Sequence, residues 1–217
     1  MSAVTLDRPW LTFDLGARMQ VLSWAIDRPG FVHARRVLWR EVRDADLPRG
    51  LDVRAWLGAE LAARGEAEAV TFVTSRDVAT FEEARAAAGG AAAHCVATVG
   101  LSNAERVGTR RPVPPSRAGT INVALRLDRG LSRPGLIEAL TIAAQARTAA
   151  ILELALDLPG IGRATGTGTD CIALAAPEGG GDHAGLHTDA GEAIGAAVFQ
   201  AVRAGGARWM AEHLGGA

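Results

Sequence analysis

Apolar residues alternate with polar ones in three short runs of the amino-terminal third, at 11–15, 19–26 and 31–42. A period of two is typical of strands that bury one face. Residues 27–30, Asp-Arg-Pro-Gly, have the chemistry of a turn and separate the last two runs. The pattern therefore predicts an antiparallel meander, with its first two strands joined at Gly16.

The spacing of apolar residues changes to that of helices in three later segments. They cover 52–64, 133–156 and 189–214. The second has the clearest signals, because Ser132 can cap its start and Pro134 suits a first helical turn. The alanine-rich segment 81–88 is predicted to be a helix or a turn, since Gly89 and Gly90 would end it.

Further strands are predicted at 69–74, 94–99, 120–127 and 171–176. Strands thus come first, and strands alternating with helices follow. That order favours segregated layers over a doubly wound parallel sheet. We therefore expect a single domain over residues 1–217 with a layered α/β fold of α+β character. Its sheet should be mixed, rich in antiparallel pairs and covered by long helices.

The composition, 48% hydrophobic and 22% charged over 217 residues, is that of an ordinary globular domain. The net charge of −1 provides no general attraction to nucleic acid or anionic membranes, so neither is expected as a partner. Cys95 and Cys171 lie in apolar runs and form no disulfide framework. No basic-then-apolar leader opens the chain, and the longest apolar helix carries Glu138 and Arg147. We therefore expect a cytoplasmic protein.

The most unusual stretch is 164–172, Ala-Thr-Gly-Thr-Gly-Thr-Asp-Cys-Ile, which has no large side chain before Cys171. Gly166 and Gly168 let a ligand approach the main chain closely. Its threonines stand two positions apart, at Thr165, Thr167 and Thr169. In an extended segment these three hydroxyls share one face. Such a segment can present a site at the mouth of a buried strand, and the alternative is a turn that merely enters that strand.

Three other patches also place polar residues where a predicted element begins or ends. They are 100–104 with Ser102 and Asn103, 119–122 with Thr120 and Asn122, and 187–192 with His187, Thr188 and Glu192. Asparagine is disfavoured in strands, so packing alone does not explain Asn103 and Asn122. If the strands are neighbours, the patches can converge on one pocket. One or two of the five scattered tryptophans could floor such a pocket for a flat ligand.

Hydroxyl-based hydrolysis is the first chemistry that these patches could carry. Ser102 or a threonine of 165–169 would attack a carbonyl. His187 would serve as base, and Asp170 or Glu192 would orient it. The chain has no Gly-x-Ser-x-Gly elbow, so the spacing does not single out one nucleophile.

A metal site and a phosphate site are the two alternatives. His183 and His187 are four positions apart and could share a helical face, but the glycines around them make a helix there doubtful. The glycine–threonine loop could hold phosphate, but it lacks the lysine and spacing of a P-loop and precedes a strand. The metal site is therefore disfavoured, and nucleotide binding of the familiar kind is not expected.

The patches, in this order, resemble the CbiZ-type adenosylcobinamide amidohydrolases. The matching stretches are 22–23, 100–104 with Arg106, 119–122, Glu138 with 144–150, 164–170, and 184–188 with 191–192. The specific ones are Thr-Gly-Thr-Gly-Thr-Asp at 165–170 and Gly-x-His-Thr at 185–188. The chain departs from the family pattern at 28–30, where a pair of glycines is expected. It departs again at His183, where a tyrosine is expected, which further disfavours a metal.

This resemblance implies a salvage enzyme of the cobamide pathway. Such enzymes hydrolyse the amide between a corrin side chain and aminopropanol and release adenosylcobyric acid. The corrinoid would be the substrate, and neither a cofactor nor a metal is expected. A homo-oligomer is possible. The alternatives are a corrinoid-binding module without chemistry and a metal-dependent hydrolase of another amide.

Roles within this expectation follow from residue chemistry. His187 is the preferred acid or base, because histidine titrates near neutral pH. The residues expected to act in catalysis are His187, Asp170, Thr167, Thr169, Ser102 and Glu192. The residues expected to bind substrate are Asn103, Thr120, Asn122, Thr165, Gly166, Gly168 and Thr188.

Overall fold

The computed structural model describes residues 2–110 and 119–215. Its centre is a mixed sheet in the order β4-β3-β2-β12-β8-β6-β5, with β1 paired to β2. These strands are β1 (Val4–Asp7), β2 (Trp10–Ser23), β3 (Gly30–Glu41), β4 (Val70–Thr74), β5 (Glu82–Ala88), β6 (Ala91–Val99), β8 (Ile121–Leu127) and β12 (Cys171–Ala176). Two short pairs are β7 (Ala104–Glu105) with β11 (Gly166–Thr167), and β9 (Asp157–Leu158) with β10 (Gly162–Arg163). The helices are α1 (Val53–Arg64), α2 (Arg133–Glu153) and α3 (Asp189–Leu214), with 3-10 turns at Asp44–Asp46 and Val78–Thr80.

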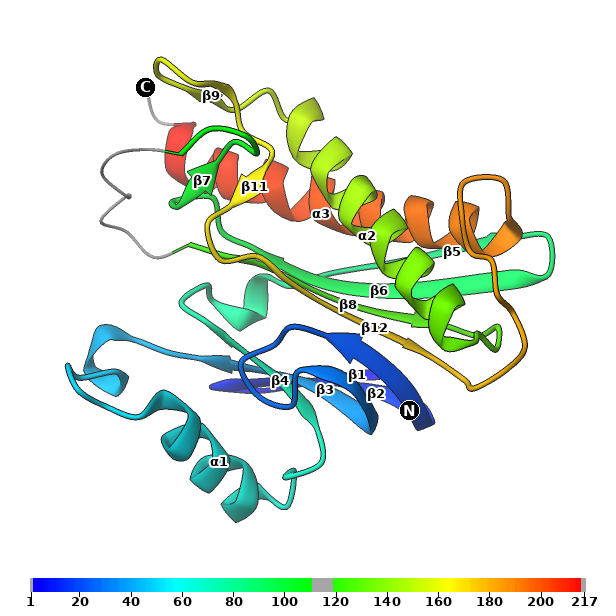
Figure 1. Cartoon of the computed structure of the whole chain (residues 1–217). Helices are drawn as coiled ribbons and strands as arrows, with labels where there is room; N and C mark the ends of the chain where they lie inside the picture. The colour runs from blue at the N-terminus through cyan, green and yellow to red at the C-terminus, as the bar shows by residue number, and fades with distance from the viewer. Residues whose placement is uncertain (1, 111–118, 216–217) are drawn as a thin grey trace.

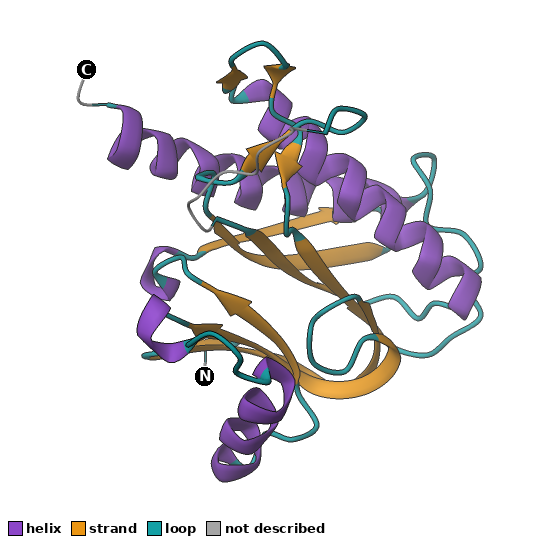
Figure 2. Ribbon diagram, turned by 60° about the vertical axis from the view of Figure 1, so that its left-hand side comes forward, coloured by secondary structure: helices purple, strands orange, loops and turns teal. Residues whose placement is uncertain are grey.

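The sheet bends back on itself, so that its two halves lie face to face (Figure 1). Strands β1–β4 form one half, and β12, β8, β6 and β5 form the other. Helices α2 and α3 cover the outside of the second half, and α1 lies beneath the first (Figures 1 and 2). The fold is thus a layered α/β sandwich with a mixed sheet in which most pairs are antiparallel, as the sequence predicted.

Alternation along the strands explains why both faces of the second half are buried. In β12, Ile172 and Leu174 pack beneath α2 and α3, while Ala173 and Ala175 face the first half. Large side chains from the first half, such as Phe13, fill the space above these small residues. A strand covered on both sides reads as a continuous apolar run, which is the pattern at 171–176.

Polar residues cap the starts of the two long helices, at Ser132 as predicted and at Thr188. Ser132 accepts a hydrogen bond from the Gly135 amide at 3.3 Å, and Thr188 accepts one from Gly191 at 3.0 Å. Each bond satisfies a donor that the first helical turn leaves free. Among the described residues, α2 is long and apolar enough to span a membrane, but its buried face, including Leu136, packs in the core against α3 and the sheet.

Two predicted elements differ in the structure. Segment 81–88 is strand β5 and not a helix, because pairing with β6 and packing of alternate residues under α3 override the helix propensity of alanine. The strands predicted at 11–15 and 19–26 form the single strand β2. Gly16, with φ of +82°, sits in an irregularity where the register with β3 shifts, so the strand bends without ending.

Candidate active site

The threonine–glycine loop, residues 164–170, is built around the carboxylate of Asp170. This side chain is only 7% exposed and is paired with Arg147 of α2. It also accepts hydrogen bonds from the amide of Thr167 at 3.0 Å, from the hydroxyl of Thr167, and from the amide of Ile121 at 3.2 Å. Burial raises the pKa of Asp170, and the Arg147 charge and these hydrogen bonds offset part of that rise. The carboxylate therefore anchors the loop and holds the Thr167 hydroxyl.

A second set of hydrogen bonds ties the loop to the turn that follows β6. The Thr165 amide donates to the Glu105 carbonyl at 2.8 Å, and the Thr165 hydroxyl accepts from the Val107 amide at 2.7 Å. The Gly168 amide donates to the Asn103 carbonyl at 3.1 Å. A Cβ on Gly168 would lie 3.0 Å from the Asn103 amide nitrogen, so the asparagine side chain lies directly over this glycine. The hydrogen bonds of Thr165 are therefore made to the protein itself, whereas the side chain of Asn103 lies against the surface of the loop at Gly168.

The start of β8 contributes Asn122, and Thr120 directly precedes that strand, on the other side of the loop. The Thr120 hydroxyl donates to the Thr169 carbonyl at 2.8 Å, and the Thr169 hydroxyl donates to the Gly119 carbonyl at 3.0 Å. Asn122 is buried, with 2% of its surface exposed. The hydrogen bonds of its side chain are long: Oδ1 accepts from the Thr120 hydroxyl at 3.4 Å, and Nδ2 donates to the Val73 carbonyl at 3.5 Å. A buried amide with long bonds retains capacity to bind a ligand.

These segments enclose a cleft between the two halves of the sheet. Its larger part has a volume of about 450 Å³ and is lined by Trp24, Ala25, Ile26, Phe72, Val73, Asn122, Gly168, Thr169, Asp170 and Cys171. An adjoining hollow of about 270 Å³ shares Val73 and Thr169 and adds Asn103, Gly119, Thr120 and the end of β4. The convergence predicted for three of the four patches is therefore observed.

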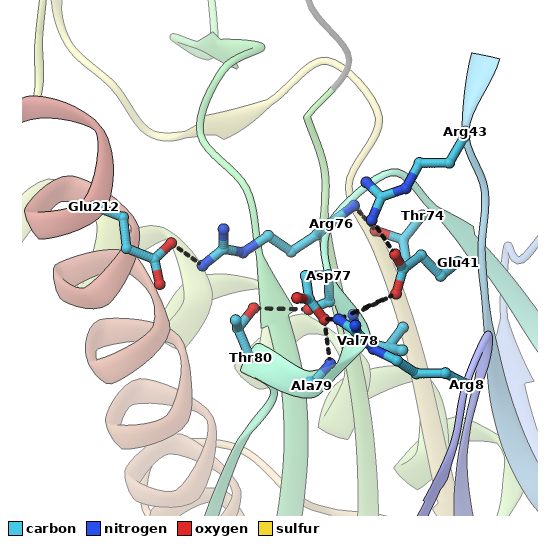
Figure 3. Close-up of polar contacts among 10 residues, drawn as sticks. All are labelled: Arg8, Glu41, Arg43, Thr74, Arg76, Asp77, Val78, Ala79, Thr80 and Glu212. Atoms are coloured by element: carbon cyan, nitrogen blue, oxygen red, sulfur yellow. Dashed lines mark hydrogen bonds and ion pairs between the residues drawn. The ribbon is translucent and has the colours of Figure 1, made fainter.

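The wall formed by the end of β4 is held by a polar network (Figure 3). The buried Glu41 carboxylate accepts from the Val78 amide at 3.1 Å and from Arg43. Arg76, just past Thr74 of the cleft, donates to Glu212 of α3 at 2.7 Å. This wall is thereby tied both to the first half of the sheet and to the last helix. No sequence signal indicated it, since its cleft residues come from an ordinary apolar strand.

The fourth patch lies at the opposite end of the sheet. Asp189 accepts a hydrogen bond from the Gly90 amide at 2.9 Å, in the turn between β5 and β6. Strand β12 separates this point from the threonine–glycine loop, and its six residues span about 20 Å. His187 and Glu192 are exposed there, and Thr188 caps α3. The expected pairing of His187 with Asp170 is therefore not formed, because Asp170 is occupied by Arg147 and the strand keeps the two apart.

Ser102, Cys171 and His183 also lie in settings that limit their chemistry. Ser102 lines a separate hollow of about 280 Å³ with Trp209 and His213, and it does not line the cleft. Burial raises the pKa of the Cys171 thiol to about 12, so the thiol stays protonated near neutral pH. His183 lies 4.0 Å from Glu138, and the part of the chain described here holds no group of three potential metal ligands.

The fold and the cleft define a layered α/β protein with a ligand cavity at the end of its central strands. The sequence profile of the adenosylcobinamide amidohydrolases, CbiZ, matches residues 2–213. The chain belongs to this family and is an amide-bond hydrolase. A search among curated proteins gives no significant match. Among solved structures, a beta-aminopeptidase from Burkholderia sp. is similar, with 13% identity and a TM-score of 0.46 over 90% of this chain and 76% of that one.

Proposed function

We propose that this protein hydrolyses the amide between the corrin side chain and the aminopropanol arm of adenosylcobinamide, releasing adenosylcobyric acid for cobamide salvage. The observation that carries the proposal is the cleft itself. The family's most specific motif, 165–170, forms one side of a cavity of about 450 Å³, and Trp24 lies at its rim with 48% of its surface exposed. The cavity accommodates the arm, and the indole offers a flat surface to the macrocycle outside it.

Thr167 does not itself line the cleft, but its hydroxyl is held by Asp170, which does, and we assign Thr167 as the nucleophile of this reaction. Its hydroxyl already donates to Asp170, whose pKa is raised by burial, and that raised pKa makes the carboxylate a better proton acceptor. Thr167 would attack the amide carbon while its proton passes to Asp170. The C–N bond then breaks, the proton moves to the departing aminopropanol nitrogen, and water hydrolyses the resulting ester. Arg147 keeps Asp170 oriented throughout.

Asn122 is placed to stabilise the oxyanion of this reaction. Its Nδ2 group has one weak acceptor, 3.5 Å away, so it can turn towards a developing negative charge on the substrate oxygen. Asn103 and Thr120, in the adjoining hollow, suit the amide groups around a corrin ring. In this proposal no metal or cofactor takes part, and the enzyme acts in the cytoplasm, as a monomer or as a homo-oligomer.

The test incubates the purified protein with adenosylcobinamide and measures free aminopropanol and adenosylcobyric acid by mass spectrometry. Wild type should release both in equal amounts, also in the presence of a chelator. Thr167→Val should lower turnover by about 10³-fold, while Thr165→Val, with its hydroxyl engaged inside the loop, serves as the matched control. Full activity of Thr167→Val would exclude that nucleophile and leave an activated water.

Two other outcomes favour the alternative functions. A shift in the corrinoid absorption spectrum without any aminopropanol would indicate a corrinoid-binding module. Loss of activity with a chelator, restored by a divalent metal, would indicate a metal-dependent hydrolase.

A further inference from the structure

Three basic or titratable side chains stand in a row on the sheet surface that faces away from α2 and α3. The register places Arg85 of β5 opposite His94 of β6, and His94 opposite Arg126 of β8. Directly opposed residues of antiparallel strands share a face, with Cβ atoms about 5 Å apart. Their chain neighbours Ala84, Ala93 and Leu125 pack in the core beneath the helices. The row therefore points to the other side.

The carboxylates near this row leave one cation without a counterion. Glu83 accepts from Arg85 at 3.0 Å and lies 2.8 Å from the Nε2 atom of His94. Asp128 is engaged by a backbone amide of β6 at 2.7 Å. The guanidinium of Arg126 has no hydrogen-bond acceptor and no carboxylate within 4 Å among residues 2–110 and 119–215. Arg85 and Arg126 thus flank His94, and an anion bound beside Arg126 would meet a guanidinium that no carboxylate of the described residues engages.

The row lines a hollow of about 370 Å³ between β5, β6 and β8. Its other lining residues are Ala86, Ala87, Ala92, Ala93 and Asp128, so four of the five are small and one carries a carboxylate. Gly16 of β2 stands beside the guanidinium, and a Cβ there would come within 3.3 Å of Arg126 Nη1. The alanines leave open space beside the Arg126 guanidinium, and the missing side chain of Gly16 lets that guanidinium pack against β2.

A second arginine-lined hollow, of about 380 Å³, provides a contrast. Each of its arginines faces a carboxylate: Arg18 lies 3.7 Å from Glu68, Arg35 lies 3.6 Å from Asp14, and Arg36 lies 2.6 Å from Glu66. That hollow is already neutralised by the protein. In the hollow beside Arg126, by contrast, no carboxylate of residues 2–110 and 119–215 lies within 4 Å of its guanidinium.

We propose that the hollow formed by Arg85, His94 and Arg126 binds a small anion through a phosphate or carboxylate group. A guanidinium presents a planar fork of donors that matches two oxygens of such a group, and Arg126 has this fork free. Arg85, at the other end of the row, is already paired with Glu83, so Arg126 supplies the free donors. Arg126 lies four residues beyond Asn122 on β8, and Phe13, Val96 and Ala124 fill the core between them. The site is therefore separate from the cleft and does not rest on the proposed reaction.

His94 supplies a direct reporter of occupancy. The pKa of His94 is lowered, and burial is the largest cause. The charges of Arg85 and Arg126 lower it further, while Glu83 opposes them. A bound anion would offset both arginines and move this pKa back up. The ring also contacts Phe13 of β2, with ring centroids 4.7 Å apart, and this contact holds it in the hollow.

The experiment follows the His94 imidazole by NMR in the full-length protein. Inorganic phosphate is titrated in one arm and acetate in the other, each against chloride at constant ionic strength. A saturable shift is expected in at least one arm, and the arm with the tighter binding identifies the group that the site prefers. Arg126→Gln should weaken that binding by about tenfold or more. Arg126→Lys keeps the charge but loses the planar pair of donors, so its affinity should lie between those of wild type and Arg126→Gln.

Arg35→Gln is the matched control, because this exposed arginine already has Asp14 as partner and lies on the other half of the sheet. It should bind like wild type. The proposal is overturned if wild type shows no saturable shift with either anion, or if Arg126→Gln binds as tightly as wild type. If Arg126→Gln does not fold, the wild-type titration and Arg126→Lys decide the question.

Discussion

The indole N–H of Trp24 donates a hydrogen bond to the backbone carbonyl of Asp170 at 2.8 Å. Trp24 directly follows β2, and Asp170 directly precedes β12, which pairs with β2 up to the register of Ser23 with Ala173. The bond ties an exposed aromatic ring to the loop that carries the anchoring carboxylate. The bond uses the backbone carbonyl of Asp170 and not its carboxylate, so removing the ring leaves the contacts of the carboxylate with Arg147 and Thr167 in place.

Removing the Trp24 ring should weaken substrate binding more than catalysis. Trp24→Ala is expected to raise KM for adenosylcobinamide by about tenfold with a small effect on kcat. The variant loses one stacking contact between the indole and the substrate, and such a contact contributes about 1 kcal/mol to binding. Steady-state kinetics measure the split. Phe31→Ala is the control, since Phe31 is also an exposed aromatic, 40% accessible, but does not line the cleft. An equal rise in KM for both variants would contradict a role for Trp24 at the rim.

Gly166 is required by the ion pair beneath the loop. A Cβ at this position would collide with the guanidinium of Arg147 and with the carboxylate of Asp170. Gly166→Ala should lower the free energy of unfolding by about 2 kcal/mol, as measured by chemical denaturation. Gly58→Ala, in the middle of α1 with no atom within 4 Å of the added methyl, should instead raise it by about 0.5–1 kcal/mol. A Gly166→Ala variant as stable as wild type would show that the loop tolerates a shifted ion pair.

Asp27 should produce a stability difference that depends on pH. Burial raises its pKa above the ordinary 3.8, and Arg28 and Arg54 offset this only in part. Its Oδ2 atom is buried and has no hydrogen-bond partner among the described residues. The folded state therefore holds this proton more tightly than the unfolded state does. Stability falls as the pH rises from 3.8 through the folded-state pKa, and the full penalty remains above that pKa.

Asp27→Asn removes this penalty, so its free energy of unfolding should exceed that of wild type at neutral pH. The difference should close as the pH falls towards 3.8. Denaturation at several pH values measures it, and Glu68→Gln, which removes an exposed carboxylate, is the control. A variant less stable than wild type at neutral pH would show that the charged form of Asp27 is stabilised by its arginine neighbours.

His187→Ala tests the placement of the fourth patch. A histidine that transfers a proton contributes about 10²-fold or more to turnover. Because His187 is exposed at the far end of β12, we expect turnover of His187→Ala to stay within about twofold of wild type. A large loss of kcat in a normally folded variant would contradict this placement. It would mean that His187 reaches the cleft from a second copy of the chain or after a large movement.

Much of the fold follows from local pattern. The cap at Ser132, the helical spacing of α2 and α3 and the apolar run of β12 all have the meaning that the sequence predicts, whereas Thr188, expected to bind substrate, caps α3. Segment 81–88 shows the limit of that approach. Its alanines favour a helix when considered alone, but β6 and α3 offer it a sheet edge and a buried face, so it forms β5.

The site divides in the same way. The sequence by itself determined the unusual chemistry of the 164–170 loop and the asparagines at two strand ends, because small residues, hydroxyls and amides at such positions are local properties. Only the tertiary structure decided their partners. Arg147 takes the place at Asp170 that His187 was expected to fill, since strand order and strand length set which ends of the sheet meet. Trp24 joins the cleft because β2 pairs with β12, and the end of β4 joins it because the bend of the sheet brings the first half over the second. Neither the pairing nor the bend is encoded in a local pattern.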